Sequence, residues 1–205
     1  MNSKGSALVI SKPLEGKKEF IENYVKNAIK ENKAILFVLT DKNPGQLKKE
    51  LLESKIFFKN LYFVDCYSLQ TEGECKEEDN VKYVSGPLAL NEMSIAVSEF
   101  ERDFLRKELP HVIIFNSLST LLMYSNANAI ARFLQILIAK IRNFNGGVIF
   151  TLEEGMHDPK EIATIEHLMD EIIEIKKEKN RIFYKTKESG KIEDWKELKS
   201  SVYQN

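Results

Sequence analysis

The sequence has little cysteine and glycine and no excess of charge of either sign. Its two cysteines, Cys66 and Cys75, are too few for a disulfide framework or a zinc site, so an apolar core must stabilise the fold. Cys66 lies in an apolar run and is interpreted as a small core residue. Because 30 lysines and arginines balance 31 aspartates and glutamates, the composition does not favour binding to nucleic-acid phosphates.

Long apolar runs are also absent. No run approaches the roughly 20 residues that a membrane-spanning helix requires. The first five residues contain no apolar centre of signal-peptide length. We therefore expect a cytoplasmic protein that does not contact a membrane. Since the chain also lacks internal repeats and Gly/Ser linkers, its 205 residues are predicted to form a single domain, residues 1–205.

The chain instead alternates short β-type runs with amphipathic helical stretches. Strands are predicted at residues 7–11, 34–40, 61–67, 81–84, 111–115 and 148–151. Helices are predicted at residues 18–31, 88–108, 128–143 and 158–169, with a further helix that begins after residue 43. The pattern ends in a hairpin of residues 171–176 and 181–186. Repeated strand–helix units predict an α/β fold with a mostly parallel sheet and helices on both faces.

Local signals support several of these boundaries. Asn43 is placed to cap a helix, with Pro44 in the first turn and Gln46 at the capping-box position. Asp158 and the proline after it give the same kind of helix start. The acidic segment 72–79 is interpreted as a solvated surface loop. Four apolar residues of the tail are predicted to form a small docking helix: Ile192, Trp195, Leu198 and Val202.

The loop after the first strand is the first candidate site, because ligands of parallel sheets bind beyond the carboxyl ends of the strands. A phosphate-binding loop has the pattern G-x-x-x-x-G-K-[ST] between a strand and a helix. Gly16 and Lys17 match this pattern, whereas Ser11 replaces its first glycine and Lys18 its final hydroxyl. The alternative is a relic loop filled by its own side chains, which Pro13 favours because it removes a backbone N–H donor.

Asn116 stands at the end of the strand 111–115, where P-loop proteins carry an aspartate that holds Mg²⁺. Asparagine keeps one oxygen but lacks the charge that attracts a divalent cation. Other chemistries have weaker signals. His157 and His167 have neighbouring carboxylates, but their spacing matches no usual ligand set, so no metal site is predicted. The serines that follow Asn116 lack the nucleophile-elbow pattern of a hydrolase.

The run IIFNSLSTLLMY, the helix containing ARFLQILIAKIR and the strand GGVIFTLEE follow one another in the order and spacing of a known family. Across residues 7–190 the chain resembles the RecA-type ATPases of the KaiC branch. The resemblance implies a single RecA-like P-loop NTPase fold, with a mostly parallel sheet that ends in a C-terminal hairpin.

The resemblance also implies roles for individual residues. Gly16 and Lys17 would contact the β- and γ-phosphates of ATP, and Asp41 would stand for the glutamate that polarises the attacking water. Lys185 and Lys187 would match the basic pair that family members offer to a nucleotide across a subunit interface, in a homo-oligomer. The alternative for these two lysines is a charged hairpin on a monomer.

Three hypotheses about function follow from these residues. Since Lys18 and Asn116 replace both Mg²⁺ ligands, efficient Mg²⁺-dependent hydrolysis is not expected. The first hypothesis is therefore a non-catalytic pseudo-ATPase that acts as a regulatory or scaffolding protein, alone or with a protein partner. The second is an ATP-binding protein or ATPase that uses Lys17 and Asp41, with or without Mg²⁺. The third is a DNA-binding recombination accessory, which the near-zero net charge disfavours.

Overall fold

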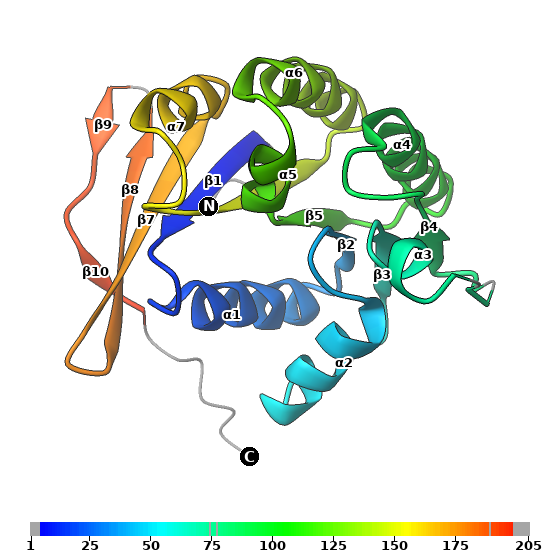
Figure 1. The fold of residues 1–205 in the computed structure, drawn as a ribbon. Coiled ribbons are helices and arrows are strands. Elements are labelled where there is room, and N and C mark those ends of the chain that lie inside the picture. The colour runs from blue at the N-terminus through cyan, green and yellow to red at the C-terminus, as the bar shows by residue number, and fades with distance from the viewer. Residues whose placement is uncertain (1–4, 74, 77, 189, 199–205) are drawn as a thin grey trace.

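A computed structural model describes residues 5–73, 75–76, 78–188 and 190–198. Ten strands of this part form one sheet, in the order β10-β8-β7-β1-β6-β5-β2-β3-β4, with β9 paired to β8 (Figure 1). The strands are β1 (Gly5–Ser11), β2 (Ala34–Leu39), β3 (Leu61–Asp65), β4 (Val81–Tyr83), β5 (His111–Asn116), β6 (Gly147–Glu153), β7 (Glu171–Glu178), β8 (Arg181–Glu188), β9 (Lys191–Ile192) and β10 (Lys196–Glu197). Neighbours from β7 through β4 are parallel, whereas β8 runs antiparallel to β7.

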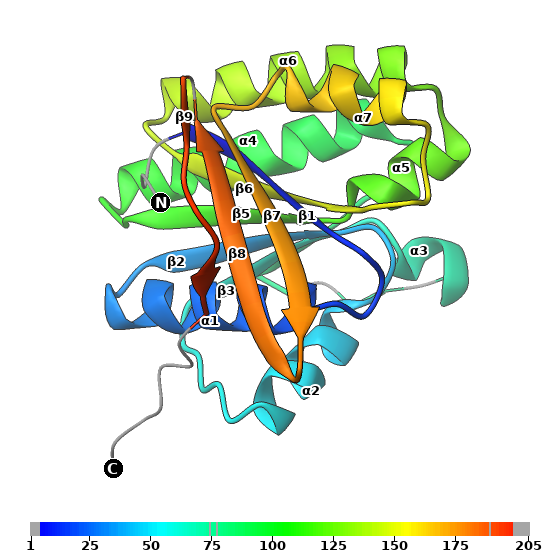
Figure 2. The same cartoon turned by 90° about the vertical axis from the view of Figure 1, so that its left-hand side faces the viewer.

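Helices cover both faces of this sheet. They are α1 (Lys17–Lys30), α2 (Pro44–Glu53), α3 (Ser68–Thr71), α4 (Leu90–Arg106), α5 (Leu118–Tyr124), α6 (Ala127–Asn143) and α7 (Pro159–Glu166). Helices α1 and α2 lie on one face, and α4, α5, α6 and α7 lie on the other (Figures 1 and 2). The predicted α/β class, with a mostly parallel sheet and helices on both faces, is confirmed.

The central strand β2 shows why the sheet is buried from both sides. All six of its residues are buried. Leu36 and Val38 pack into the cluster that α4 and α6 complete, whereas Ile35 and Phe37 face the cluster of α1 and α2. A strand with helices on both faces has no solvent-facing side, so its sequence is apolar throughout instead of alternating.

The predicted start of α2 is confirmed at atomic detail. The side chain of Asn43 accepts a hydrogen bond from the backbone N–H of Gln46 at 2.8 Å, and the Gln46 side chain accepts one from the N–H of Asn43 at 3.0 Å. This reciprocal pair satisfies two N–H groups that the first helical turn would otherwise leave without partners.

Removal of this cap is expected to be measurable. Asn43→Ala should lower the free energy of unfolding by about 1 kcal/mol, because the backbone N–H of Gln46 loses its acceptor. Lys49→Ala, an exposed position in the same helix, serves as the control and should change it by less than about 0.5 kcal/mol. Urea denaturation measures both, and equal effects of the two substitutions would show that the cap contributes nothing.

The closing hairpin is confirmed, but the docking helix predicted for the tail is wrong. Lys179 and Asn180 both have positive φ, 45° and 66°, as the tight turn between β7 and β8 requires. Beyond the hairpin the tail forms β9 and β10 instead of a helix. The backbone N–H of Glu193 bonds to Thr186, and that of Leu198 bonds to Ile182. The open edge of β8 thus offers hydrogen-bond partners to the backbone of the tail. These bonds favour strands over the helix that the spacing of the apolar tail residues predicted.

Two short helices were not predicted, and part of two predictions lies outside the described residues. Helix α5 buries Leu118, Leu121 and Leu122, which have helical spacing over less than two turns. Helix α3 begins where the buried carboxylate of Asp65 accepts bonds from the backbone N–H groups of Tyr67 and Ser68, which also ends the strand earlier than predicted. Residues outside the described part include Val202 of the predicted tail helix and Glu74 and Glu77 of the acidic segment.

No helix in the described ranges is long and apolar enough to cross a bilayer.

Candidate functional site

Four neighbouring strands end at the same edge of the sheet and bring most of the predicted site residues together. In the registers of the strand pairs, Ser11 of β1 lies opposite Glu153 of β6, and Leu39 of β2 lies opposite Asn116 of β5. The chain turns into α1 and α2 below the sheet after β1 and β2, and into α5 and α7 above it after β5 and β6 (Figure 1). Such a reversal is where parallel sheets open a crevice for ligands.

The conformation of the loop after β1 depends on the positive φ of Gly16 and on the packing of the loop against β8. Gly16 has a φ of 95°, which favours glycine, and a Cβ there would lie 3.0 Å from the Cγ2 of Ile182 on β8. The β7–β8 hairpin therefore occupies the space beside this glycine. At the start of the loop, the Oγ of Ser11 is buried and has no hydrogen-bond partner in the described part of the chain.

Lys17, the first residue of α1, is already paired within the chain. Its Nζ lies 2.6 Å from the Oε1 of Glu153 at the end of β6. The two side chains are 21% and 26% exposed, so the pair is partly shielded from water. The backbone N–H of Glu153 in turn donates to the Oγ of Ser119 at 2.8 Å, which fixes the end of β6. The ammonium group of Lys17 is thus paired with a carboxylate of the same chain.

Asn116 joins the ends of three strands through its amide. Its Oδ1 accepts a 3.0 Å hydrogen bond from the Oγ1 of Thr151 on β6, and its Nδ2 lies 3.4 Å from the Oδ1 of Asp41, a long and weak contact. The Thr40 hydroxyl donates to the carbonyl of Ser117 at 3.0 Å, and the peptide bond between Asn116 and Ser117 is cis. The oxygen of the Asn116 amide is therefore engaged within the protein, whereas, among the described residues, its nitrogen makes only the weak contact with Asp41.

The carboxyl of Asp41 is perturbed although the residue is exposed. Protein atoms crowd around the group, and this desolvation raises its pKa above the ordinary value. The nearby charges of Lys42 and Lys17 act in the opposite direction, and the charge of Glu153 adds to the rise. Asp41 therefore lies close enough to Lys17 and Glu153 to share one electrostatic environment with them.

The remaining predicted residues lie away from this environment. Lys18 is exposed and its ammonium group lies 3.8 Å from Glu22, one turn further along α1. Lys185 and Lys187, on β8, both pair with Glu174 of β7. The Lys185 distance is 2.6 Å. Within the chain, the two lysines predicted for a subunit interface thus share one carboxylate on the neighbouring strand.

Glu153 is the residue of this edge that the sequence reasoning missed. Its signal was present, because Glu153 and Glu154 follow an apolar strand whose end meets that of β1. What the sequence could not supply is the strand order, which places β6 directly beside β1. Among the described residues, no group of three or more His, Cys, Asp or Glu side chains is arranged to hold a metal ion.

Fold and edge together define an α/β protein with a mostly parallel sheet and an internally paired lysine at the end of its first strand. Residues 5–175 match a family of unknown function (DUF7504), and the chain belongs to this family. No curated protein of known function matches the sequence.

A solved structure of another protein shares the fold. It is an uncharacterized protein, PH0321, from Pyrococcus horikoshii, crystallised in complex with an unknown peptide. The TM-score is 0.70 at 14% sequence identity, over 92% of this chain and 84% of that chain. At this identity the similarity concerns the fold alone.

Proposed function

We propose that this chain is a KaiC-like domain with the RecA-type P-loop fold whose nucleotide site has lost its catalytic parts. It acts as a regulatory or scaffolding protein by binding another polypeptide. The observation that carries the proposal is the ion pair between Lys17 and Glu153. A nucleotide would have to break this pair and place its phosphates beside the displaced carboxylate.

The surrounding residues also disfavour magnesium chemistry. A P-loop enzyme needs a hydroxyl after its lysine and a carboxylate at the end of the next catalytic strand. Lys18 and Asn116 occupy these two places, and the Asn116 amide is bound to Thr151. Without a divalent cation, the carboxylates of Asp41 and Glu153 would repel a triphosphate. Phosphoryl transfer depends on such charge neutralisation, so hydrolysis is not supported.

The choice of a polypeptide partner comes from the structural neighbour. The Pyrococcus protein was crystallised with a peptide, and its fold extends over most of this chain. A RecA-type sheet that has lost its nucleotide chemistry keeps a large surface through which it can bind another chain.

The proposal predicts the outcome of an ATP hydrolysis assay with Mg²⁺. Wild-type protein and Lys17→Ala should release phosphate at the same background rate. Lys12→Ala removes an exposed lysine of the same loop and is the matched control. Mg²⁺-dependent turnover that disappears in Lys17→Ala and persists in Lys12→Ala would overturn the proposal.

That outcome would support the second candidate, an ATPase or ATP-binding protein that uses Lys17 and Asp41. Two observations favour it. The buried hydroxyl of Ser11 has no partner among the described residues, and the pKa of Asp41 is raised by desolvation, as a general base requires. The same assay separates the two functions, because Asp41→Asn would abolish turnover only in the second.

A further inference from the structure

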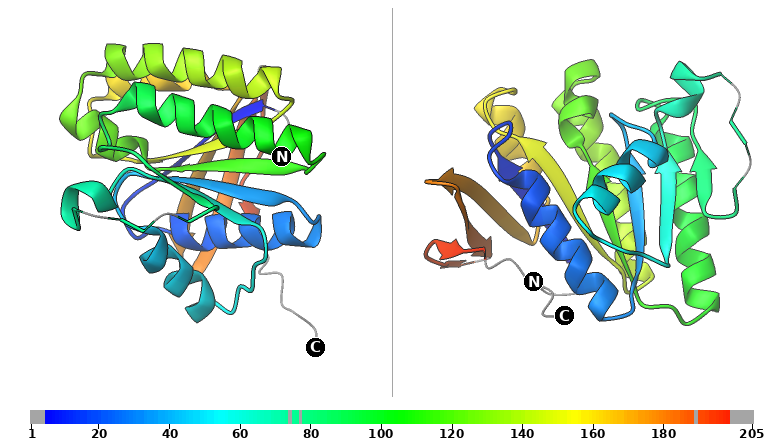
Figure 3. Two further views of the ribbon diagram at one scale, coloured as in Figure 1. Left: turned by 90° about the vertical axis from the view of Figure 1, so that its right-hand side faces the viewer. Right: turned by 90° about the horizontal axis from the view of Figure 1, so that it is seen from below.

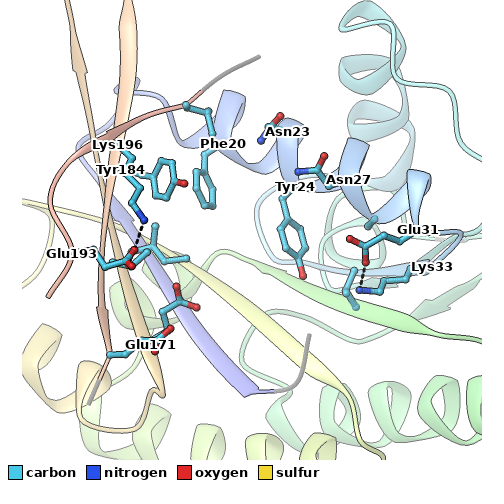
Figure 4. Close-up of a pocket in the computed structure, with 16 residues that line it drawn as sticks. Phe20, Asn23, Tyr24, Asn27, Glu31, Lys33, Glu171, Tyr184, Glu193 and Lys196 are labelled. Carbon is cyan, nitrogen blue, oxygen red and sulfur yellow. Dashed lines mark hydrogen bonds and ion pairs between the residues drawn. The ribbon is translucent and has the colours of Figure 1, made fainter. Parts of the chain in front are cut away.

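A cavity of about 740 Å³ opens between α1 and the strands β7 and β8 (Figure 4). A second cavity, of about 540 Å³, lies at the amino-terminal ends of β1, β6 and β7. The two share the lining residues Tyr24, Glu171 and Glu188, and we call them together the acidic hollow. Figure 3 shows α1 between the β7–β8 hairpin and α2. The second cavity lies at the strand starts, whereas the first extends along α1 from Phe20 to Glu31.

Two glutamates face each other in this hollow. Glu171 of β7 and Glu188 of β8 are direct cross-strand partners, so their side chains project from the same face of the sheet. Glu171 is only 9% exposed. Burial raises the pKa of its carboxyl, the charge of the chain's amino terminus acts in the opposite direction, and the charges of Glu188 and Glu193 add to the rise. Like charges directly opposite each other in a sheet destabilise the pair.

No described residue neutralises these two carboxylates. The lysines that line the hollow pair with other glutamates: Lys187 with Glu174 outside it, and Lys196 with Glu193 and Lys33 with Glu31 in its own lining. Within the described residues, the side chain of Glu171 has no hydrogen bond or ion pair, although the residue as a whole is buried. A buried carboxylate that opens into a cavity and has no partner among the described residues can bind a cation there.

Aromatic side chains form the walls of the hollow. Phe20 and Tyr184 lie with ring centroids 5.8 Å apart, and Tyr24 lies to the right of them and of Glu171 in Figure 4. Burial, together with the charges of Glu31 and Glu171, raises the pKa of Tyr24 to about 12, so its hydroxyl stays protonated. Aromatic walls around carboxylates suit a cation carried on an apolar stem.

We propose that the acidic hollow binds a lysine or arginine side chain of a partner polypeptide, with Glu171 and Glu188 as the groups that hold its charge. A polypeptide fits better than a free amine, because the two cavities both adjoin Glu171 and Glu188 and together have room for residues that flank the cation. The inference rests on the proposed function, in that it names the chemistry of the partner.

Binding is tested with the full chain and fluorescein-labelled, N-acetylated pentalysine and pentaarginine peptides, with pentaglutamate as the charge-reversed probe. Fluorescence anisotropy should show binding of the two basic peptides that weakens as salt rises. The Glu171→Gln/Glu188→Gln variant should weaken it by about tenfold or more, since charge-assisted contacts are lost. Glu53→Gln, an exposed glutamate on α2, is the matched control and should leave affinity unchanged within about twofold.

The location of the bound peptide is determined from backbone NMR chemical shifts. On addition of a basic peptide, the shifts of Tyr24, Glu171 and Ile173 should change. In the absence of peptide, the double variant should melt at a higher temperature than wild type, because the repulsion between the two carboxylates is removed. This result also shows that the variant folds. No binding of either basic peptide, or equal binding by the double variant and wild type, would overturn the inference.

Other occupants give distinct results. Spermidine that binds at least as tightly as pentalysine would replace the polypeptide with a small amine. Self-association that the double variant abolishes would assign the hollow to a second copy of the chain. Mg²⁺-dependent ATP turnover would overturn the proposed function while leaving peptide binding at Glu171 intact, so the two failures are distinguishable.

Discussion

Phe115→Ala is expected to lower the free energy of unfolding by about 3–5 kcal/mol, because it leaves a cavity in the middle of the sheet. Phe115 is fully buried on β5, and its ring centroid lies 5.6 Å from that of Phe150 and 6.4 Å from that of Phe133. These neighbours belong to β6 and α6, so the cavity would lie between the sheet and the helix that covers it.

The measurement is urea denaturation followed by circular dichroism. Leu105→Ala is the control, since Leu105 is 59% exposed on α4 and should lose about 1 kcal/mol or less. Equal losses in the two variants would contradict the packing of α6 on β5. So would an unfolding midpoint for Phe115→Ala that matches that of wild type.

Glu101→Ala is expected to cost about 3 kcal/mol at pH 6, because it breaks a buried pair. The Oε2 of Glu101 lies 2.9 Å from the Nε2 of His111, and the two side chains are 1% and 8% exposed. Burial alone would lower the pKa of His111, but the hydrogen bond and charge of Glu101, together with the carbonyl of Leu109, more than offset it. The pKa of His111 is therefore raised.

The raised pKa fixes how this cost varies with pH. A histidine whose pKa is higher in the folded than in the unfolded protein stabilises the fold fully below its unfolded pKa of about 6.5. That stability is lost as pH rises through the folded pKa. Denaturation at pH 6 and pH 9 should show a smaller cost of Glu101→Ala at the higher pH. A constant or larger cost there, or an equal cost of the exposed control Arg102→Ala, would contradict the pair.

Elements with both a periodic core face and a cap could be predicted closely. The long helix predicted at 128–143 begins one residue earlier and ends at the same residue. Asn43 and Asp158 both cap the helices for which they were predicted. These elements obey local rules, because their end signals and their apolar spacing lie within a few residues of one another.

Elements that depend on distant partners could not be predicted. The tail forms strands only because β8 presents an open edge, and that edge exists only after the hairpin has folded. The pairing of Lys17 with Glu153 spans 136 positions and depends on the strand order. The sequence therefore predicted the loop and its replaced residues, but not the carboxylate that forms an ion pair with Lys17.

The central claim is that Lys17 is held by Glu153 and that the site takes no Mg²⁺-nucleotide. Calorimetric titration of ATP, with and without Mg²⁺, tests it most directly in wild type, Glu153→Gln and the neighbouring control Glu154→Gln. We expect no Mg²⁺-dependent binding of ATP by wild type. ATP should bind about tenfold more tightly to Glu153→Gln than to Glu154→Gln, because Lys17 is released from its ion pair. Wild-type binding that Mg²⁺ strengthens, with no gain in Glu153→Gln, would contradict it.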